Sequence, residues 1–313
     1  INELGNCFYI NEQRQLVSGP QFSRIKHLDD VPSPYMTGLF DHFLADDSYQ
    51  PLIQTNRGCP YKCTFCSEGS DYYNKLHFHS IDFVKEELDY IAERVNPSVG
   101  LYIADSNLGM YKQDLEIAYH LKKLQDKYNW PMQIAVSTGK SQLQRIKKVA
   151  EIVGNAFKIT NAIQSRSNDV LDAVKRKNAS NLDEFLKGPD LVSDPDLIFP
   201  LPKETKKTFI DGLNDLLDLR AGKAPLQVTI FPALLLSNTE MNSDIKNKKQ
   251  DLQIKYSQHH NQTGWVAGEL VCETQCDIYS TDTMNEKDVW EAQKYAILQT
   301  ALLREEPLNE IFY

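Results

Sequence analysis

The stretch Asn56-Arg57-Gly58-Cys59-Pro60-Tyr61-Lys62-Cys63-Thr64-Phe65-Cys66 places three cysteines close together, with three and then two residues between them. Iron–sulfur cubes are normally held by four thiolates, so a compact run of three predicts a cube in which one iron has no protein ligand. An open coordination position on a metal is where chemistry takes place. Gly58 would let the backbone pass close to such a group because it has no Cβ, and Pro60 fixes one φ angle of the loop.

Two other interpretations of the cysteines stay open at this point. Cys59, Cys63 and Cys66, followed by His77 or His79, could form a tetrahedral Cys3His zinc site. The three could also be unrelated core cysteines. A motif remains a hypothesis until its structural context agrees with it, so the pattern of strands and helices around the loop is the next test.

The composition is that of an ordinary globular protein. The chain has 313 residues, of which 41% are hydrophobic and 25% charged, enough for one large domain or two modest ones. No apolar run approaches the roughly 18 residues that a membrane span needs. The net charge of −9 argues against a broad nucleic-acid surface, which is usually basic. We therefore expect neither a membrane nor a nucleic acid as partner.

The six cysteines are too few for a disulfide scaffold in a chain of this length. No signal peptide is recognisable, so the expected location is the reducing cytoplasm. The first residue is Ile1 rather than Met. We therefore expect the natural protein to extend before this residue.

Short apolar runs alternate with amphipathic stretches from about Leu52 onward. The expected strands are Leu52–Thr55, Leu101–Ala104, Met132–Val136, Ala156–Ile163, Asp196–Phe199 and Leu226–Phe231. The expected helices start after the N-cap Ser80 and then cover about Ile117–Tyr128, Leu143–Val153, Asn168–Lys177 and Phe209–Leu219. Six strands alternating with helices predict a parallel α/β sheet with right-handed crossovers.

Polar residues follow the ends of these predicted strands. The segments are the cysteine loop, Asp105-Ser106-Asn107, Ser137-Thr138-Gly139, Gln164-Ser165 and Pro200-Leu201-Pro202-Lys203-Glu204-Thr205. Parallel α/β folds build their sites at the carboxyl ends of strands. The zinc alternative predicts no such coincidence, so the strand-end pattern favours a cluster at the mouth of a barrel.

The octet Cys59–Cys66, with Phe65 just before the third cysteine, resembles the cluster motif of the radical S-adenosylmethionine (SAM) superfamily. The order of strands and helices over about Leu52–Leu236 resembles the partial (β/α)6 barrel of that family. The resemblance implies a [4Fe-4S] cluster whose unique iron binds the amino and carboxylate groups of SAM. The reduced cluster passes one electron to the sulfonium, which releases a 5'-deoxyadenosyl radical. An external one-electron reductant such as flavodoxin or ferredoxin is implied as a partner.

The resemblance also implies residues that contact SAM. Gln164-Ser165, followed by Leu171 and Arg176, is similar to a stretch in which the glutamine contacts the ribose and the arginine pairs with the SAM carboxylate. The planar fork of arginine suits that pairing. Arg176 could instead be an exposed helix arginine between Lys175 and Lys177.

Three further contacts are implied by position. Phe65 would lie against the adenine, and Ser137 would contact the ribose or the methionine moiety. Asp105 would accept from the amino group, where most of the family carries a Gly-Gly-Glu-like segment that this chain lacks. Phe65 could equally be a packing aromatic and Ser137 a loop serine.

Other polar residues have no firm role in the sequence. Lys203 stands where the family usually has glycine and would place a cation near the barrel mouth. Tyr72, Tyr73, His77 and His79 could line a substrate cavity or face solvent. Cys272 and Cys276 are too few for a second cluster and are expected to be structural or free thiols.

A proline-stiffened segment, Asp29–Phe40, resembles the connector between the cobalamin-binding domain and the barrel in the cobalamin (B12)-binding branch of the family. Asp105–Tyr111 is also similar to that branch. The expected organisation is a connector at 1–48, a radical SAM core at 49–240 and a C-terminal extension at 241–313. The extension should contain a strand at Trp265–Cys272 and a helix at Asp288–Leu303.

The function implied by this branch is cobalamin-dependent methylation of an unactivated centre, with SAM, a [4Fe-4S] cluster and cobalamin as cofactors. Two alternatives stay open. One is a radical SAM enzyme that catalyses cyclisation, rearrangement or oxidation without methyl transfer, and the other is a non-catalytic zinc or Fe–S module. The substrate, a small molecule or a peptide, is not readable from the residues.

Overall fold

Two three-stranded parallel sheets carry the fold in the computed structural model, which describes residues 5–187, 194–219, 228–247 and 251–304. The strands of the first sheet are β3 (Leu52–Ile53), β6 (Leu101–Leu108) and β7 (Ile134–Thr138), in that order. The strands of the second are β8 (Thr160–Gln164), β9 (Asp194–Phe199) and β10 (Thr229–Pro232). Within the described residues the spatial order of these strands follows the sequence, as the alternating pattern predicts.

The two sheets meet between β7 and β8. Thr138 Oγ1 donates to Thr160 O over 2.5 Å, and Ile134 N donates to Ala156 O over 2.8 Å. The six strands therefore form one open arc, which confirms the partial (β/α)6 barrel. β8 begins at Thr160 rather than at the predicted Ala156, because Ala156 ends the turn after the preceding helix and only its carbonyl joins β7.

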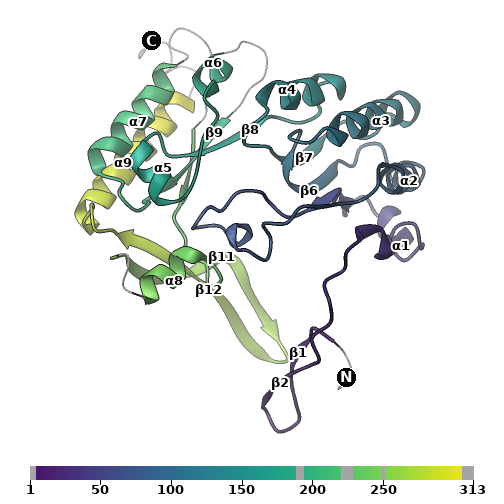
Figure 1. The fold of residues 1–313 in the computed structure, drawn as a ribbon, viewed down its shortest axis with the longest axis horizontal. Coiled ribbons are helices and arrows are strands. Elements are labelled where there is room, and N and C mark those ends of the chain that lie inside the picture. Colours follow the sequence, from purple (N-terminus) through teal and green to yellow (C-terminus); the bar gives the residue numbers. More distant parts are fainter. Residues whose placement is uncertain (1–4, 188–193, 220–227, 248–250, 305–313) are drawn as a thin grey trace.

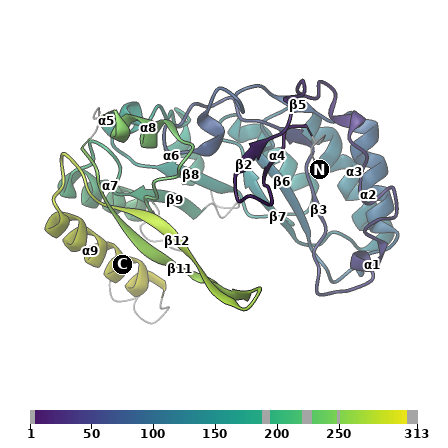
Figure 2. The same ribbon diagram turned by 90° about the horizontal axis from the view of Figure 1, so that it is seen from below.

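Helices connect the strands and pack outside the arc. They are α2 (Ile81–Ala92), α3 (Gln113–Tyr128), α4 (Leu143–Ile152), α5 (Asn168–Ala173), α6 (Leu182–Leu186) and α7 (Lys206–Asp218). Figures 1 and 2 show α2 and α3 at one end of the arc and α7 at the other. Ser80 caps α2 as predicted, since its side chain accepts from Phe83 N over 3.1 Å. One buried cluster fills the space between the first sheet and α2–α4, and another lies beneath α7.

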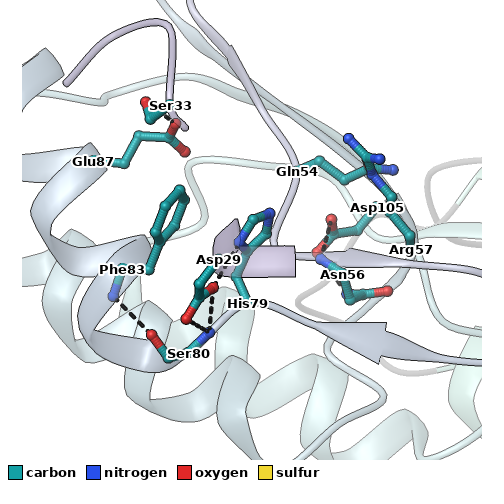
Figure 3. Close-up of polar contacts among 10 residues, drawn as sticks. All are labelled: Asp29, Ser33, Gln54, Asn56, Arg57, His79, Ser80, Phe83, Glu87 and Asp105. Carbon is teal, nitrogen blue, oxygen red and sulfur yellow. Dashed lines mark hydrogen bonds and ion pairs between the residues drawn. The ribbon is translucent and has the colours of Figure 1, made fainter. Parts of the chain in front are cut away.

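The N-terminal part carries a two-stranded ribbon, β1 (Phe8–Ile10) and β2 (Leu16–Ser18), then a 3-10 turn and a short helix, α1 (Asp41–Leu44). The proline-stiffened segment Asp29–Phe40 is thus a turn region that precedes a short helix. Asp29 accepts from Ser80 N over 3.1 Å and pairs with His79 over 2.9 Å (Figure 3). Ser33 donates to the buried Glu87 over 2.5 Å. The connector is therefore fastened to the start and the inner face of α2.

The C-terminal part consists of α8 (Glu240–Lys246), β11 (Gln253–Val266), β12 (Glu269–Ser280) and α9 (Glu286–Arg304). The prediction of one strand at Trp265–Cys272 is wrong. The chain reverses at Ala267 and Gly268, both with positive φ, so two long antiparallel strands form a hairpin that extends away from the arc (Figure 1). The apolar run that suggested one strand spans this turn.

The predicted C-terminal helix is confirmed and lies beside the barrel. Val289, Ala292 and Ala296 of α9 join the buried cluster beneath α7, and Tyr295 donates to Asn214 over 2.7 Å. None of the helices in the described ranges is both long and apolar enough to cross a membrane.

Candidate active site

The three cysteines lie on a loop between two short paired strands, β4 (Asn56–Arg57) and β5 (His77–Phe78). The loop is folded tightly on itself at two glycines. Gly58 has φ +102°, and a Cβ there would lie 2.5 Å from Lys75 O. At Gly69 a Cβ would lie 2.2 Å from Cys63 O. Substituting either glycine would therefore push apart the backbone that holds the cysteines.

Backbone hydrogen bonds attach this loop to the second half of the barrel. Thr64 N donates over 3.1 Å to the carbonyl of Val174, the residue that follows α5. Thr64 O accepts over 2.9 Å from Met241 N of α8. In Figure 1 the loop, drawn in dark blue, lies on the inner side of the arc of strands. The cysteines are thus held against the strand ends that the sequence singled out.

A cavity of about 280 Å³ opens beside the loop. Seven of the nine residues expected at the site line it: Cys59, Cys63, Cys66, Phe65, Ser137, Gln164 and Arg176. Cys59 and Cys63 are buried, and Cys66 is half-buried. Three thiols therefore line one cavity, and thiolates are the ligands that iron–sulfur clusters use.

Arg176 reaches the cavity because α5 ends earlier than predicted. The sequence favoured a helix through Lys177, but α5 ends at Ala173 and Lys175 adopts a left-handed φ of +54°. Arg176 N then donates to Leu171 O over 2.8 Å and Lys175 N to Asp172 O over 3.1 Å, which is a Schellman motif. This termination turns Arg176 inward, so it is 3% exposed while Lys175 and Lys177 are exposed. The alternative of an exposed helix arginine is wrong.

Two polar atoms of the cavity have no partner in the described part of the chain, Arg176 Nη1 and Gln164 Oε1. The other Arg176 nitrogens are used, since Nη2 donates to Ala162 O and Nε donates to Asn178 Oδ1 over 3.3 Å. Burial lowers the pKa of the Arg176 guanidinium. Unpaired buried polar groups are costly and ask for an explanation. A ligand that brings both an anionic acceptor and a hydroxyl donor would satisfy these two atoms.

Gln164 itself is held in an uncommon backbone conformation. Its φ is +71°, and the pairing of β8 with β9 shifts register between Ala162 and Gln164. Such bulges re-aim side chains and are frequent beside active sites. The bulge here directs the Gln164 side chain into the cavity.

Asp105 and Ser165 do not line the cavity. The Asp105 carboxylate accepts from Asn56 Nδ2 over 2.9 Å (Figure 3). It also accepts from Thr55 N over 2.8 Å and from the Thr55 hydroxyl. Burial raises the pKa of Asp105. Asp105 therefore ties the end of β3 and the start of the cysteine loop to β6. Ser165 donates to Glu204 instead.

Three residues of this region were missed by sequence reasoning: Tyr61, Asn107 and Lys140. Asn107 Nδ2 donates to Cys59 Sγ over 3.4 Å, and Lys140 Nζ donates to Asn107 Oδ1 over 3.3 Å. Lys140 and Arg176 both lie over the Tyr61 ring, at 5.6 and 5.9 Å from its centroid. Asn107 lies in the last two residues of β6, and Lys140 is two residues beyond the end of β7 at Thr138, so their position at strand ends is the one signal that could have indicated them.

The remaining candidates lie elsewhere. His79 pairs with Asp29 and stacks on Phe83 at 4.4 Å, and Lys203 pairs with Asp282 over 2.6 Å. His77, Tyr72 and Tyr73 line a separate cavity of about 450 Å³. Among the described residues no three His, Cys, Asp or Glu side chains are arranged to hold a single metal ion. The Cys3His zinc alternative therefore finds no support in this geometry.

Comparison with known proteins agrees with the geometry. Residues 53–215 match the family model described as the radical SAM superfamily. That match covers half of the chain and includes the cysteine loop and five of the barrel strands. The chain therefore belongs to the radical SAM superfamily.

Two curated relatives are methyltransferases. The chain is 31% identical to the cobalamin-dependent radical SAM methyltransferase TokK of Streptomyces tokunonensis over 252 residues. The aligned region covers 76% of this chain and 36% of the relative. The chain is 29% identical over 245 residues to the 2-(S-pantetheinyl)-carbapenam-3-carboxylate methyltransferase of Streptantibioticus cattleyicolor, covering 74% and 35%. The chain thus spans about a third of the length of these relatives.

Solved structures show the same fold. The radical SAM methyltransferase TsrM of Kitasatospora setae matches with a TM-score of 0.59 at 12% identity, covering 83% of this chain and 52% of that one. The cobalamin-dependent SAM radical enzyme OxsB matches with a TM-score of 0.58 at 16% identity, covering 80% and 42%. These likenesses extend beyond the residues of the family match into the connector or the C-terminal extension.

Proposed function

We propose that this chain is the catalytic core of a cobalamin-dependent radical SAM methyltransferase. One observation carries the proposal: three cysteines line the same cavity at the carboxyl ends of the strands as Gln164 and Arg176, two residues that each carry a buried polar atom without a partner in the described part of the chain, Oε1 and Nη1. A carboxylate and a ribose hydroxyl are the groups of SAM that these two atoms would satisfy.

In this proposal Cys59, Cys63 and Cys66 hold a [4Fe-4S] cluster, which, when bound, supplies one electron for reductive cleavage of SAM to a 5'-deoxyadenosyl radical. The reductant would be a one-electron carrier such as flavodoxin or ferredoxin in a reducing compartment, which suggests the cytoplasm. The residues of this chain bind and orient SAM. The planar guanidinium of Arg176 would pair with its carboxylate, and Gln164 would accept from the ribose.

Two further cavity residues complete the proposed SAM site. Phe65 precedes the third cysteine and would lie against the adenine, while Ser137 at the end of β7 would donate to the ribose or the methionine moiety. Asp105 and Ser165 would support the site from behind, because Asp105 holds the cysteine loop and Ser165 holds the turn after β9.

Two curated relatives support methyl transfer with cobalamin: the name of one includes cobalamin, and both are named as methyltransferases. The segment Asp29–Phe40, which resembles the connector of the cobalamin-binding branch and is hydrogen-bonded to α2 and its N-cap, also supports it. The substrate would be a small molecule or a peptide with an unactivated centre. Cobalamin, when bound, would supply the methyl group that is transferred.

The test uses the full-length protein purified anaerobically with hydroxocobalamin. About four irons with matching sulfide, corrinoid absorbance that survives desalting, and label transferred from methyl-labelled SAM would support the proposal. 5'-Deoxyadenosine formed without bound corrinoid or methyl transfer would favour cyclisation, rearrangement or oxidation instead. One zinc per chain and no iron would overturn the radical assignment.

A further inference from the structure

The side chain of Asn107, which lies outside the cysteine loop, donates to a cysteine sulfur of the site. Its amide is 1% exposed, and Nδ2 lies 3.4 Å from Cys59 Sγ. A buried amide so close to a thiol is either a packing contact or a contact to a metal-bound thiolate. The residue that contacts the oxygen of the Asn107 amide, Lys140, distinguishes these two possibilities.

Lys140 fixes which way the Asn107 amide points. Its Nζ lies 3.3 Å from Asn107 Oδ1. A lysine ammonium has three donors and no acceptor, so it must face the oxygen of the amide. The nitrogen of the amide must then face sulfur. A cationic donor thus polarises an amide whose N–H points at one of the three cysteines.

The backbone brings Lys140 to this position. Gly139 N donates to Leu108 O over 2.9 Å, which closes the turn after β7 onto the end of β6. A Cβ at Gly139 would lie 2.8 Å from Met110 Cβ, so only glycine allows this close approach. Lys140 also lines the cavity with the three cysteines. The pair is therefore a built feature of the strand ends.

We infer that Asn107, oriented by Lys140, is a positioning residue that raises the reduction potential of the cluster through Cys59. The inference rests on the cluster proposed above. Reduction adds one electron to the cluster, from the external one-electron donor, and increases the negative charge on its thiolates. Hydrogen bonds to cluster sulfurs are one of the factors that set such potentials. A donor aimed at Cys59 stabilises the reduced form more than the oxidised form, and the positive charge of Lys140 acts in the same direction.

The test is redox potentiometry of the cluster, followed by electron paramagnetic resonance, in the full-length protein. Asn107→Leu keeps the volume and removes the N–H donor. At a fixed potential near the midpoint of the parent, we expect the ratio of reduced to oxidised cluster to be about tenfold lower, which for one electron corresponds to a midpoint about 59 mV lower. Lys140→Met should lower the same ratio less, by about threefold. The decrease in the double variant should be smaller than the product of the two single decreases, since both residues act through one amide.

Asn74→Leu is the matched control. Its amide also contacts the segment that carries the cysteines, but it donates to the backbone carbonyls of Pro60 over 3.1 Å and Cys59 over 3.4 Å and not to sulfur. Its midpoint should equal that of the parent. A midpoint in Asn107→Leu equal to that of the parent, with iron content unchanged, would overturn the inference and leave the cluster proposal standing. If Asn107→Leu takes up no iron, Lys140→Met decides the matter by the same measurement. A parent protein without iron would overturn both.

Discussion

Ser165 Oγ donates to Glu204 Oε2 over 2.8 Å and so joins the end of β8 to the turn that follows β9. Glu204 is 1% exposed and also accepts from Thr208 Oγ1 over 2.7 Å. Burial raises the pKa of Glu204. This carboxyl therefore holds the residue next to Gln164 in place and also braces the start of α7.

Glu204→Ala should destabilise the fold by about 1–3 kcal/mol, because the buried Ser165 hydroxyl and the half-buried Thr208 hydroxyl lose their acceptor. Glu204→Gln should lose less stability than Glu204→Ala, since its amide oxygen can still accept one of these hydrogen bonds. The measurement is the free energy of unfolding in urea. Lys203→Ala is the control, because its exposed ion pair with Asp282 is worth at most about 1 kcal/mol. Equal losses in Glu204→Ala and Lys203→Ala would refute the bracing role.

Replacing any one of Cys59, Cys63 and Cys66 with alanine should remove the cluster, because two thiolates do not hold a cube that normally needs at least three. The iron and sulfide content and the visible absorbance of anaerobically reconstituted protein measure this. Cys272→Ser combined with Cys276→Ser should leave both unchanged. These two cysteines lie on the β12 hairpin strand, exposed and half-buried. Full iron content in Cys63→Ala would contradict the assignment.

Arg176→Gln should weaken SAM binding by at least tenfold. A hydrogen bond to a charged group is worth about 1.5–3 kcal/mol, and about 1.4 kcal/mol corresponds to a factor of ten in Kd. Lys177→Gln is the matched control, since Lys177 is the next residue, carries the same charge and is exposed. Calorimetric titration of the cluster-loaded protein with SAM gives both affinities. Equal Kd values for the two variants would argue against Arg176 as the carboxylate partner.

Asp114 should make stability fall as pH rises. It is fully buried at the start of α3, its Oδ2 accepts from Tyr111 N over 2.9 Å, and burial raises the pKa of Asp114 to about 7. The unfolded chain has an ordinary pKa near 3.9. The folded state therefore binds the proton more tightly, and stability decreases between about pH 4 and pH 7. The total effect is on the order of a few kcal/mol.

Asp114→Asn removes this ionisation, so its stability relative to the parent should increase as pH rises through that window. Urea unfolding at intervals from pH 4.5 to pH 8 measures the difference. Asp126→Asn is the control on the same helix, because Asp126 is exposed and pairs with Lys122 at the surface. Parallel profiles for Asp114→Asn and the parent would show that Asp114 ionises normally.

Much of the barrel could be predicted because its signals are local. The strands of the core are short apolar runs. Ser80 is the N-cap of α2 because its hydroxyl accepts from the backbone N–H of Phe83, only three residues away. The hairpin at Gly268 was missed because its strands are largely exposed and pair with each other rather than with the core. Apolar periodicity carries little information about such a ribbon.

The sequence by itself determined the cysteine triad, the alternation of strands and helices and the strand ends at which a site would form, because spacing and periodicity are properties of neighbouring residues. Only the tertiary structure decided which side chains face the cavity. Arg176 faces it because Lys175 adopts a left-handed φ and ends α5 early, and Asp105 is turned away by its bonds to Thr55 and Asn56. The contact between Asn107 and Cys59 joins residues 48 positions apart. Such contacts depend on how separate strands pack, and no local pattern encodes them.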